Sequence, residues 1–199
     1  MKFEIIMKKY LLLFITLISY SFGFAQEKLI KDIDLDGIKD TVYIDVKGFI
    51  VCQLSTQKFK KIKSKVIEIM NDNSRISGTK NGFEFRNNWM RAGYANQFRY
   101  NKALKKVQLI GMSRYEFGNA ANDGSGESSV NLLNGDYLGN WNYFSVAKNK
   151  LIKIPTIKAK MVFAKIYLED FGEETYFNFS DRCTKLYEQG KAKTQKVKG

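Results

Sequence analysis

Four aspartates at regular spacing in one short loop constrain this chain more than any other feature of its sequence. They occupy positions one, three, five and nine of the loop, and Gly37 provides the sharp turn after the third. Oxygen atoms spaced in this way can wrap around a hard cation, as the loops of calcium-binding proteins do. The sequence therefore predicts a calcium site. Its expected ligands are the side chains of Asp32, Asp34, Asp36 and Asp40 and the backbone carbonyl of Ile38.

The residues after this loop exclude the helix-flanked EF-hand. Position twelve is Tyr43, where an EF-hand needs a bidentate glutamate. Residues 41–46 alternate apolar and polar side chains, which is typical of a half-buried strand. A second interpretation stays open, in which the loop is an acidic, solvated connection between strands. Calcium is favoured over it because four carboxylates this close would repel one another without a cation.

The pattern Asp-x-Asp-x-Asp-Gly-x-x-Asp leading into a strand resembles the calcium loops of FG-GAP repeat proteins and of related secreted bacterial modules. The resemblance covers residues 30–46 only. FG-GAP modules are blades of a propeller, and several copies are needed to bury their faces. This sequence has no second copy of the motif. The resemblance therefore implies the metal loop and not the propeller.

The rest of the chain predicts a mainly β fold, a single antiparallel sheet or sandwich-like domain over residues 26–190. Gly48 separates two strand-like runs, 41–46 and 49–54, and favours a tight hairpin. The lysine-rich segment 59–70 and the segment 157–168 are also expected to contain strands. Asn81-Gly82 is a turn signal that opens the alternating run 83–86.

A second resemblance spans three segments in the middle of the chain. They are Phe98-Arg99-Tyr100, residues 107–111 and residues 129–135, and Asn134 stands where the pattern has threonine. The segments are similar to a pattern in secreted bacterial β-domains to which no activity is assigned. Physically they indicate three consecutive antiparallel strands, with Gly111 and Gly135 at bulges or strand ends. The aromatic residues beside Arg99 suit either a core or stacking on sugars or bases.

A short helix is expected near the carboxyl terminus. Ser180 and Asp181 offer an N-cap for residues 182–189, and Gly190 is a typical helix end. The following residues 191–199 are rich in lysine, and we expect them to be disordered.

Residues 1–25 have the three parts of a secretory signal peptide. Lysines precede a short apolar run, and a Gly-x-Ala junction precedes Gln26. The apolar run is short for a membrane span. We therefore expect a mature chain that begins at Gln26, has no membrane span after cleavage, and is periplasmic or secreted.

The charge of the chain suggests anionic partners. The formal net charge is +13, and loss of three lysines and one glutamate with the signal peptide leaves +11. An anionic envelope polymer or a protein partner suits this charge, while scattered lysines indicate no specific nucleic-acid site. The oligomeric state is left open. Cys52 and Cys183 could form a disulfide after export, or Cys52 could be a buried free thiol.

The composition also limits catalysis. The chain has no histidine, so it cannot form a Ser-His-Asp or Cys-His arrangement. Two hypotheses remain. The first is an exported, non-enzymatic β-domain with one calcium loop that binds a partner. The second is a carbohydrate-active envelope enzyme with carboxylate catalysts, for which the acidic run 169–174 offers candidates. Two carboxyl groups about 5–10 Å apart in a groove would favour the enzyme, and a groove without acids would favour the binding domain.

Overall fold

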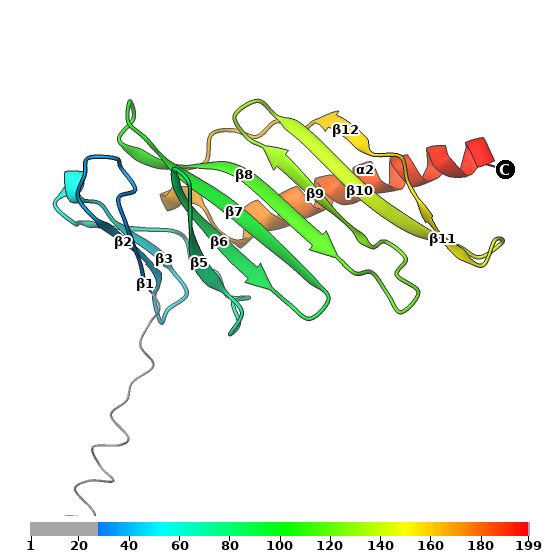
Figure 1. The fold of residues 1–199 in the computed structure, drawn as a ribbon, viewed down its shortest axis with the longest axis horizontal. Helices are drawn as coiled ribbons and strands as arrows, with labels where there is room; N and C mark the ends of the chain where they lie inside the picture. Colours follow the sequence, from blue (N-terminus) through cyan, green and yellow to red (C-terminus); the bar gives the residue numbers. More distant parts are fainter. Residues whose placement is uncertain (1–27, 199) are drawn as a thin grey trace, which may run out of the picture.

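The computed structural model describes residues 28–198. The predicted signal peptide and the predicted start at Gln26 lie outside these residues. Among the described residues, no helix combines the length and the apolar character that crossing a membrane requires. The chain forms two antiparallel sheets and one long helix (Figure 1), so the mainly β prediction is confirmed.

The small sheet contains the first four strands in the order of the sequence. It consists of β1 (Lys28–Lys31), β2 (Asp40–Ile44), β3 (Ile50–Gln53) and β4 (Lys61–Lys63). The predicted hairpin is confirmed as β2 and β3. Gly48 has a φ of 81° in its turn, and the N–H of Asp45 donates to the carbonyl of Phe49 over 2.8 Å. A positive φ of this kind favours glycine.

The large sheet is a meander in which each strand pairs with its neighbour in sequence, with one added strand at the end. Its strands are β5 (Arg75–Thr79), β6 (Gly82–Asn88), β7 (Ala92–Asn101), β8 (Lys106–Glu116), β9 (Gly126–Asn131), β10 (Asp136–Ser145), β11 (Lys150–Lys153) and β12 (Ile157–Lys160), which pairs with β10. The three segments of the second resemblance lie on β7, β8 and β9, so their predicted antiparallel order is confirmed. The register shifts between Gln97 and Phe98, opposite Gly111, which confirms the predicted bulge.

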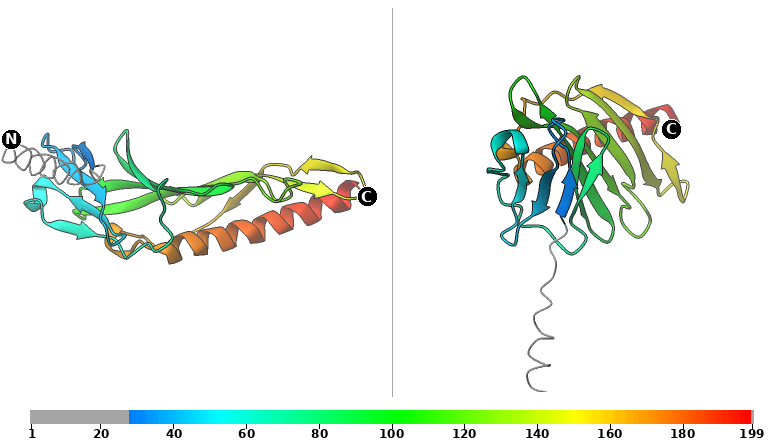
Figure 2. Two further views of the ribbon diagram at one scale, coloured as in Figure 1. Left: turned by 90° about the horizontal axis from the view of Figure 1, so that it is seen from below. Right: turned by 60° about the vertical axis from the view of Figure 1, so that its left-hand side comes forward.

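Helix α2 (Glu173–Lys198) lies along one face of the large sheet, and the other face is left open (Figure 2). The prediction of a short helix that ends at Gly190, followed by a disordered tail, was wrong. A Cβ on Gly190 would lie 2.8 Å from Cδ1 of Ile157, so this glycine allows the helix to approach the sheet closely. Beyond it, Thr194 is buried. Packing against the sheet therefore stabilises the last turns of α2, and this contact cannot be read from the lysine-rich sequence.

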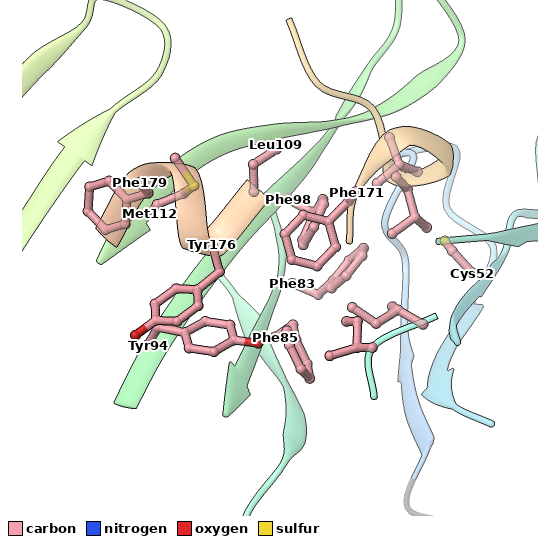
Figure 3. Close-up of a cluster of buried hydrophobic side chains, with 14 of the residues drawn as sticks. Cys52, Phe83, Phe85, Tyr94, Phe98, Leu109, Met112, Phe171, Tyr176 and Phe179 are labelled. Carbon is pink, nitrogen blue, oxygen red and sulfur yellow. The ribbon is translucent and has the colours of Figure 1, made fainter. Parts of the chain in front are cut away.

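The core is rich in aromatic side chains, lies between α2 and the large sheet, and continues to the small sheet, where it includes Cys52 (Figure 3). Phe83 and Phe98 stack across β6 and β7 with ring centroids 5.0 Å apart. Phe171 follows the short 3₁₀ helix η2 (Leu168–Asp170) and meets Phe98 edge to face at 5.1 Å. Tyr94 of β7 stacks on Tyr176 of α2 at 3.9 Å. These contacts hold the helix to the sheet.

Two segments form less strand than expected. In the segment 59–70, only Lys61–Lys63 pairs as a strand. Beyond it, the N–H of Lys65 donates to the carbonyl of Phe171, and the N–H of Ile67 donates to that of Gly48. In the segment 157–168, the strand ends at Lys160. In both segments, hydrogen bonds to distant parts of the chain replace a regular ladder, which local alternation could not predict.

Of the two alternatives left open for the cysteines, the structure shows free, buried thiols and no disulfide. Cys52 lies on β3 of the small sheet. Cys183 lies on α2, and its Sγ accepts a hydrogen bond from the hydroxyl of Ser128 over 3.4 Å. The two thiols therefore lie on different elements, although both are part of one continuous hydrophobic core.

Candidate metal centre

The aspartate loop joins β1 to β2 at one end of the small sheet (Figure 1). The antiparallel register pairs Lys31 with Asp40. Asp32 and Asp40, the first and last acids of the loop, therefore lie where the chain enters and leaves it. Leu35 and Gly37 have φ angles of 64° and 92°, which turn the backbone back on itself. Glycine is favoured at position 37 because of this positive φ and not because of crowding, since a Cβ there would meet nothing within 4 Å.

Asp32 organises the backbone of the loop. One carboxylate oxygen accepts the N–H groups of Leu35 over 2.7 Å and Asp36 over 3.2 Å. The other accepts the N–H of Gly37 over 3.0 Å. The first aspartate therefore draws the following turn around its own carboxylate, which is the local reason that this sequence forms a closed loop.

Asp40 is fully buried, and its charge is stabilised by three backbone donors. One oxygen accepts the N–H groups of Ile33 over 2.7 Å and Asp34 over 3.1 Å. The other accepts the N–H of Ser55 over 2.8 Å. These charge-assisted bonds join both ends of the loop to the segment that follows β3.

Asp34 is almost as deeply buried, with 2% of its surface exposed, but its two oxygens differ. Oδ2 accepts the hydroxyl of Thr56 over 2.5 Å and the Thr56 N–H over 3.3 Å. Oδ1 is buried and has no hydrogen-bond partner among the described residues. A carboxylate oxygen without a partner in the interior is costly unless a cation or another donor meets it.

The carboxylates of Asp32, Asp34 and Asp40 converge. Each offers an oxygen, and these atoms lie within 4.8 Å of one another. Such a cluster could hold a metal ion, and its all-oxygen donor set is the one that hard cations prefer. The coarser form of the prediction, an acidic cluster able to hold a metal, therefore stands on the geometry.

Asp36 is not among the carboxylates that converge, and the Ile38 carbonyl stays a predicted ligand. Asp36 accepts the hydroxyl of Ser55 over 2.7 Å and the N–H of Ile38 over 2.8 Å. The hydrogen bond from Ser55 and that from Ile38 hold the pKa of Asp36 below its usual value. Ile38 has an exposed side chain, and it contributes its N–H to Asp36.

The sequence argument missed Ser55 and Thr56, which begin the 3₁₀ helix η1 (Ser55–Gln57). Their hydroxyls reach Asp36 and Asp34, respectively. The register pairs Thr41 with Gln53, so a residue just beyond β3 comes to lie beside the start of β2. The sequence signal that could have revealed Ser55 and Thr56 is a pair of hydroxyl residues shortly after the second strand of the hairpin.

Both the loop and η1 touch the large sheet through its β7–β8 turn. The ammonium of Lys102 lies 3.4 Å from the carbonyl of Leu35. The side-chain amide of Gln57 donates to the carbonyl of Lys105 over 3.0 Å. The acidic loop is therefore placed where the two sheets meet.

Cys52 lies behind the loop on β3, and its pKa is raised by burial and further by the charges of Asp40 and Asp34. A thiol in this state is a packing residue and a poor ligand or nucleophile.

The acidic run that could have supplied catalytic carboxylates is dispersed. Glu169 pairs with Lys106 at 3.6 Å, and Glu174 pairs with Lys65 at 3.7 Å. Glu173 accepts the N–H of Ile69 over 2.5 Å. These carboxylates serve separate structural contacts.

Comparisons of the chain with protein-family models, with curated proteins and with solved structures found no match. We therefore infer its function from its residues and their geometry.

Proposed function

We propose that this chain is an exported, non-enzymatic β-domain that binds one calcium ion in the loop 32–40 and an anionic envelope component on its surface. We infer export from the signal sequence. We infer the preference for anions from the net charge of +11 that remains once the signal peptide is removed. The metal part rests on one observation, the buried and unpartnered Oδ1 of Asp34.

That oxygen lies in a cluster that a cation would complete. Asp32, Asp34 and Asp40 would hold the ion, and its charge would offset the repulsion among them. Backbone N–H groups already hold Asp32 and Asp40 in place without the ion. Calcium is favoured over magnesium because it accepts irregular sets of oxygen ligands, whereas magnesium demands a tight octahedron.

The ion would have a structural role. It would fix the loop to η1 through Asp34 and Thr56, and so to the β7–β8 turn that Gln57 and Lys102 contact. Calcium would in this way stiffen the junction of the two sheets.

The binding role is supported by the hollow on the open face of the large sheet. Its lining combines amides, hydroxyls and one guanidinium, and no aspartate or glutamate is among the described residues that line it. By the criterion set out from the sequence, a groove of this composition favours a binding domain over a carboxylate hydrolase.

The calcium proposal is tested by titration calorimetry with calcium and with magnesium. We expect a single calcium site in the wild type, weaker binding of magnesium, and no calcium binding in Asp34→Asn. Asp72→Asn is the matched control, because it removes one negative charge from an exposed turn and should bind calcium normally. Absence of calcium heat in the wild type, or equal loss in both variants, would refute the site.

A further inference from the structure

A shallow hollow of about 400 Å³ lies on the open face of the large sheet, opposite the face that α2 covers. We call it the open-face groove. Three neighbouring strands, β7, β8 and β9, form its floor and walls.

The register explains why the sheet is hollow here. Ala95, Ser113 and Ser129 lie side by side on the three strands, so the floor has only short side chains. In the next row, Gly111 lies between Gln97 and Asn131 and leaves a gap between two longer amides. The hollow therefore arises from residues that are far apart in the sequence.

Gly111 is the informative residue of this row. It does not have a φ in the left-handed region, and a Cβ added to it would make only ordinary contacts, 3.5 Å from the carbonyl of Val130 and 3.8 Å from the Gln97 side chain. Neither the backbone nor the packing requires glycine. Glycine weakens a strand, and inside strands it often marks a bulge, such as the one beside Gly111, or a place where a ligand approaches closely.

The groove holds one cationic side chain, Arg99. Its guanidinium makes no ion pair and no hydrogen bond with any residue that the structure describes. The nearby acid Glu84, by contrast, is only 6% exposed and is already paired with Arg86. The charge of Arg99 is thus available to an anion, and a guanidinium is well suited to bind a carboxylate with two parallel hydrogen bonds.

The remaining polar groups are neutral, and among them the amide nitrogen of Gln97 already donates to the carboxylate of Glu84 over 3.3 Å. The hydroxyls of Ser113 and Ser129 have no partner among residues 28–198, and the amide nitrogen of Asn131 is equally free. A surface that alternates such groups matches a ligand that carries many hydroxyls. Ile110 and Leu133 add apolar contacts at the rim for the C–H groups of such a ligand.

From these observations we propose that the open-face groove binds an acidic saccharide, with its carboxylate on Arg99 and its hydroxyls on the amides and serines of the groove. The volume suits one or two sugar rings of a longer chain. This inference rests on the proposed binding role and gives it a place and a ligand class. It does not depend on the calcium loop.

The test is a calorimetric titration with trigalacturonate and with its methyl ester, which has the same skeleton but no charge. We expect the wild type to bind the acid and to bind the ester at least tenfold more weakly. Arg99→Gln should weaken binding of the acid at least tenfold. Lys153→Gln is the control, because it removes one positive charge from β11, outside the groove, and should leave the affinity unchanged.

Gly111→Ala separates a ligand-binding glycine from a structural one. We expect the added methyl to weaken trigalacturonate binding severalfold while raising the melting temperature by about 2 °C, because alanine is the better strand residue. A structural glycine would give a lower melting temperature instead.

Three results would overturn the proposal. They are no binding of trigalacturonate by the wild type, equal binding of the ester, and equal weakening by Arg99→Gln and Lys153→Gln, which would indicate diffuse charge attraction. Repeating the titration with chelator keeps the two proposals apart. Saccharide binding without any calcium binding would refute only the calcium site, and calcium binding without saccharide binding would refute only this inference.

Discussion

The loop end of the small sheet and the helix-covered face of the large sheet both bury side chains, but these side chains have opposite chemistry. In the loop, the fully buried Asp40 and the nearly buried Asp34 are held by N–H and hydroxyl donors. Under α2, the buried side chains are aromatic rings such as Phe98 and Phe171, packed edge to face. The stability of the loop region should therefore depend on cations and pH, and the stability of the aromatic region on substitutions that remove buried side-chain volume.

The largest effect should come from the aromatic region. Phe171→Ala removes a ring that is 1% exposed and contacts both Phe98 and Phe85. We expect it to lower the free energy of unfolding by about 3–5 kcal/mol. Urea denaturation with and without calcium measures this loss. An equal loss of stability with and without calcium would support independence of the two regions. A loss that depends on calcium would show that the two regions are coupled.

Calcium should act on the loop region with the next largest effect. At a hundredfold excess over its dissociation constant, it should raise the stability of the wild type by about 2.7 kcal/mol, because the unfolded chain lacks the site. Asp34→Asn should lose this gain, and Asp72→Asn should keep it. Thermal melts with calcium and with chelator measure the difference. Equal gains in all three proteins would place the ion elsewhere.

The two buried thiols report on the two regions separately. Cys52 lies behind Asp40 in the small sheet, whereas Cys183 lies on α2. Chelator should loosen the loop and speed alkylation of Cys52 severalfold, with little change at Cys183. Mass spectrometry of the labelled peptides gives both rates from one sample. Equal acceleration at both thiols would show that the regions open together.

The smallest expected effect concerns the hydrogen bond between Ser55 and Asp36. This bond contributes most to the lowered pKa of Asp36, so Ser55→Ala should raise that pKa toward 3.8. A folded-state pKa below the unfolded value gives stability that is present above the unfolded pKa and is lost as pH falls through the folded one. The wild type should therefore keep this small contribution to a lower pH than the variant does. Carboxyl-carbon NMR titration without calcium checks it, and an unchanged pKa in the variant would contradict it.

The acidic loop was predicted well because its information is local. Asp32 binds N–H groups three to five residues further on, and such contacts follow from spacing alone. The partners from η1 were missed because Ser55 and Thr56 meet the loop only through the pairing of β2 with β3.

The carboxyl-terminal helix was predicted too short for a related reason. Read locally, Gly190 opposes a helix, and the run of lysines after it favours disorder through charge repulsion. In the folded chain, Gly190 lets α2 approach Ile157, and the Lys191 ammonium lies over the rings of Tyr143 and Tyr187. Contacts with the sheet thus outweigh local propensity.

By itself, the sequence determined the mainly β character, the β2–β3 hairpin and the aspartate loop, because strand alternation, turn glycines and the spacing of the aspartates act over a few residues. Only the tertiary structure decided the length of α2, the separation of Cys52 from Cys183, and the groove in which Gln97, Gly111 and Asn131 share one row. These features depend on strand register and on packing between distant segments, and neither is encoded in the neighbourhood of any one residue.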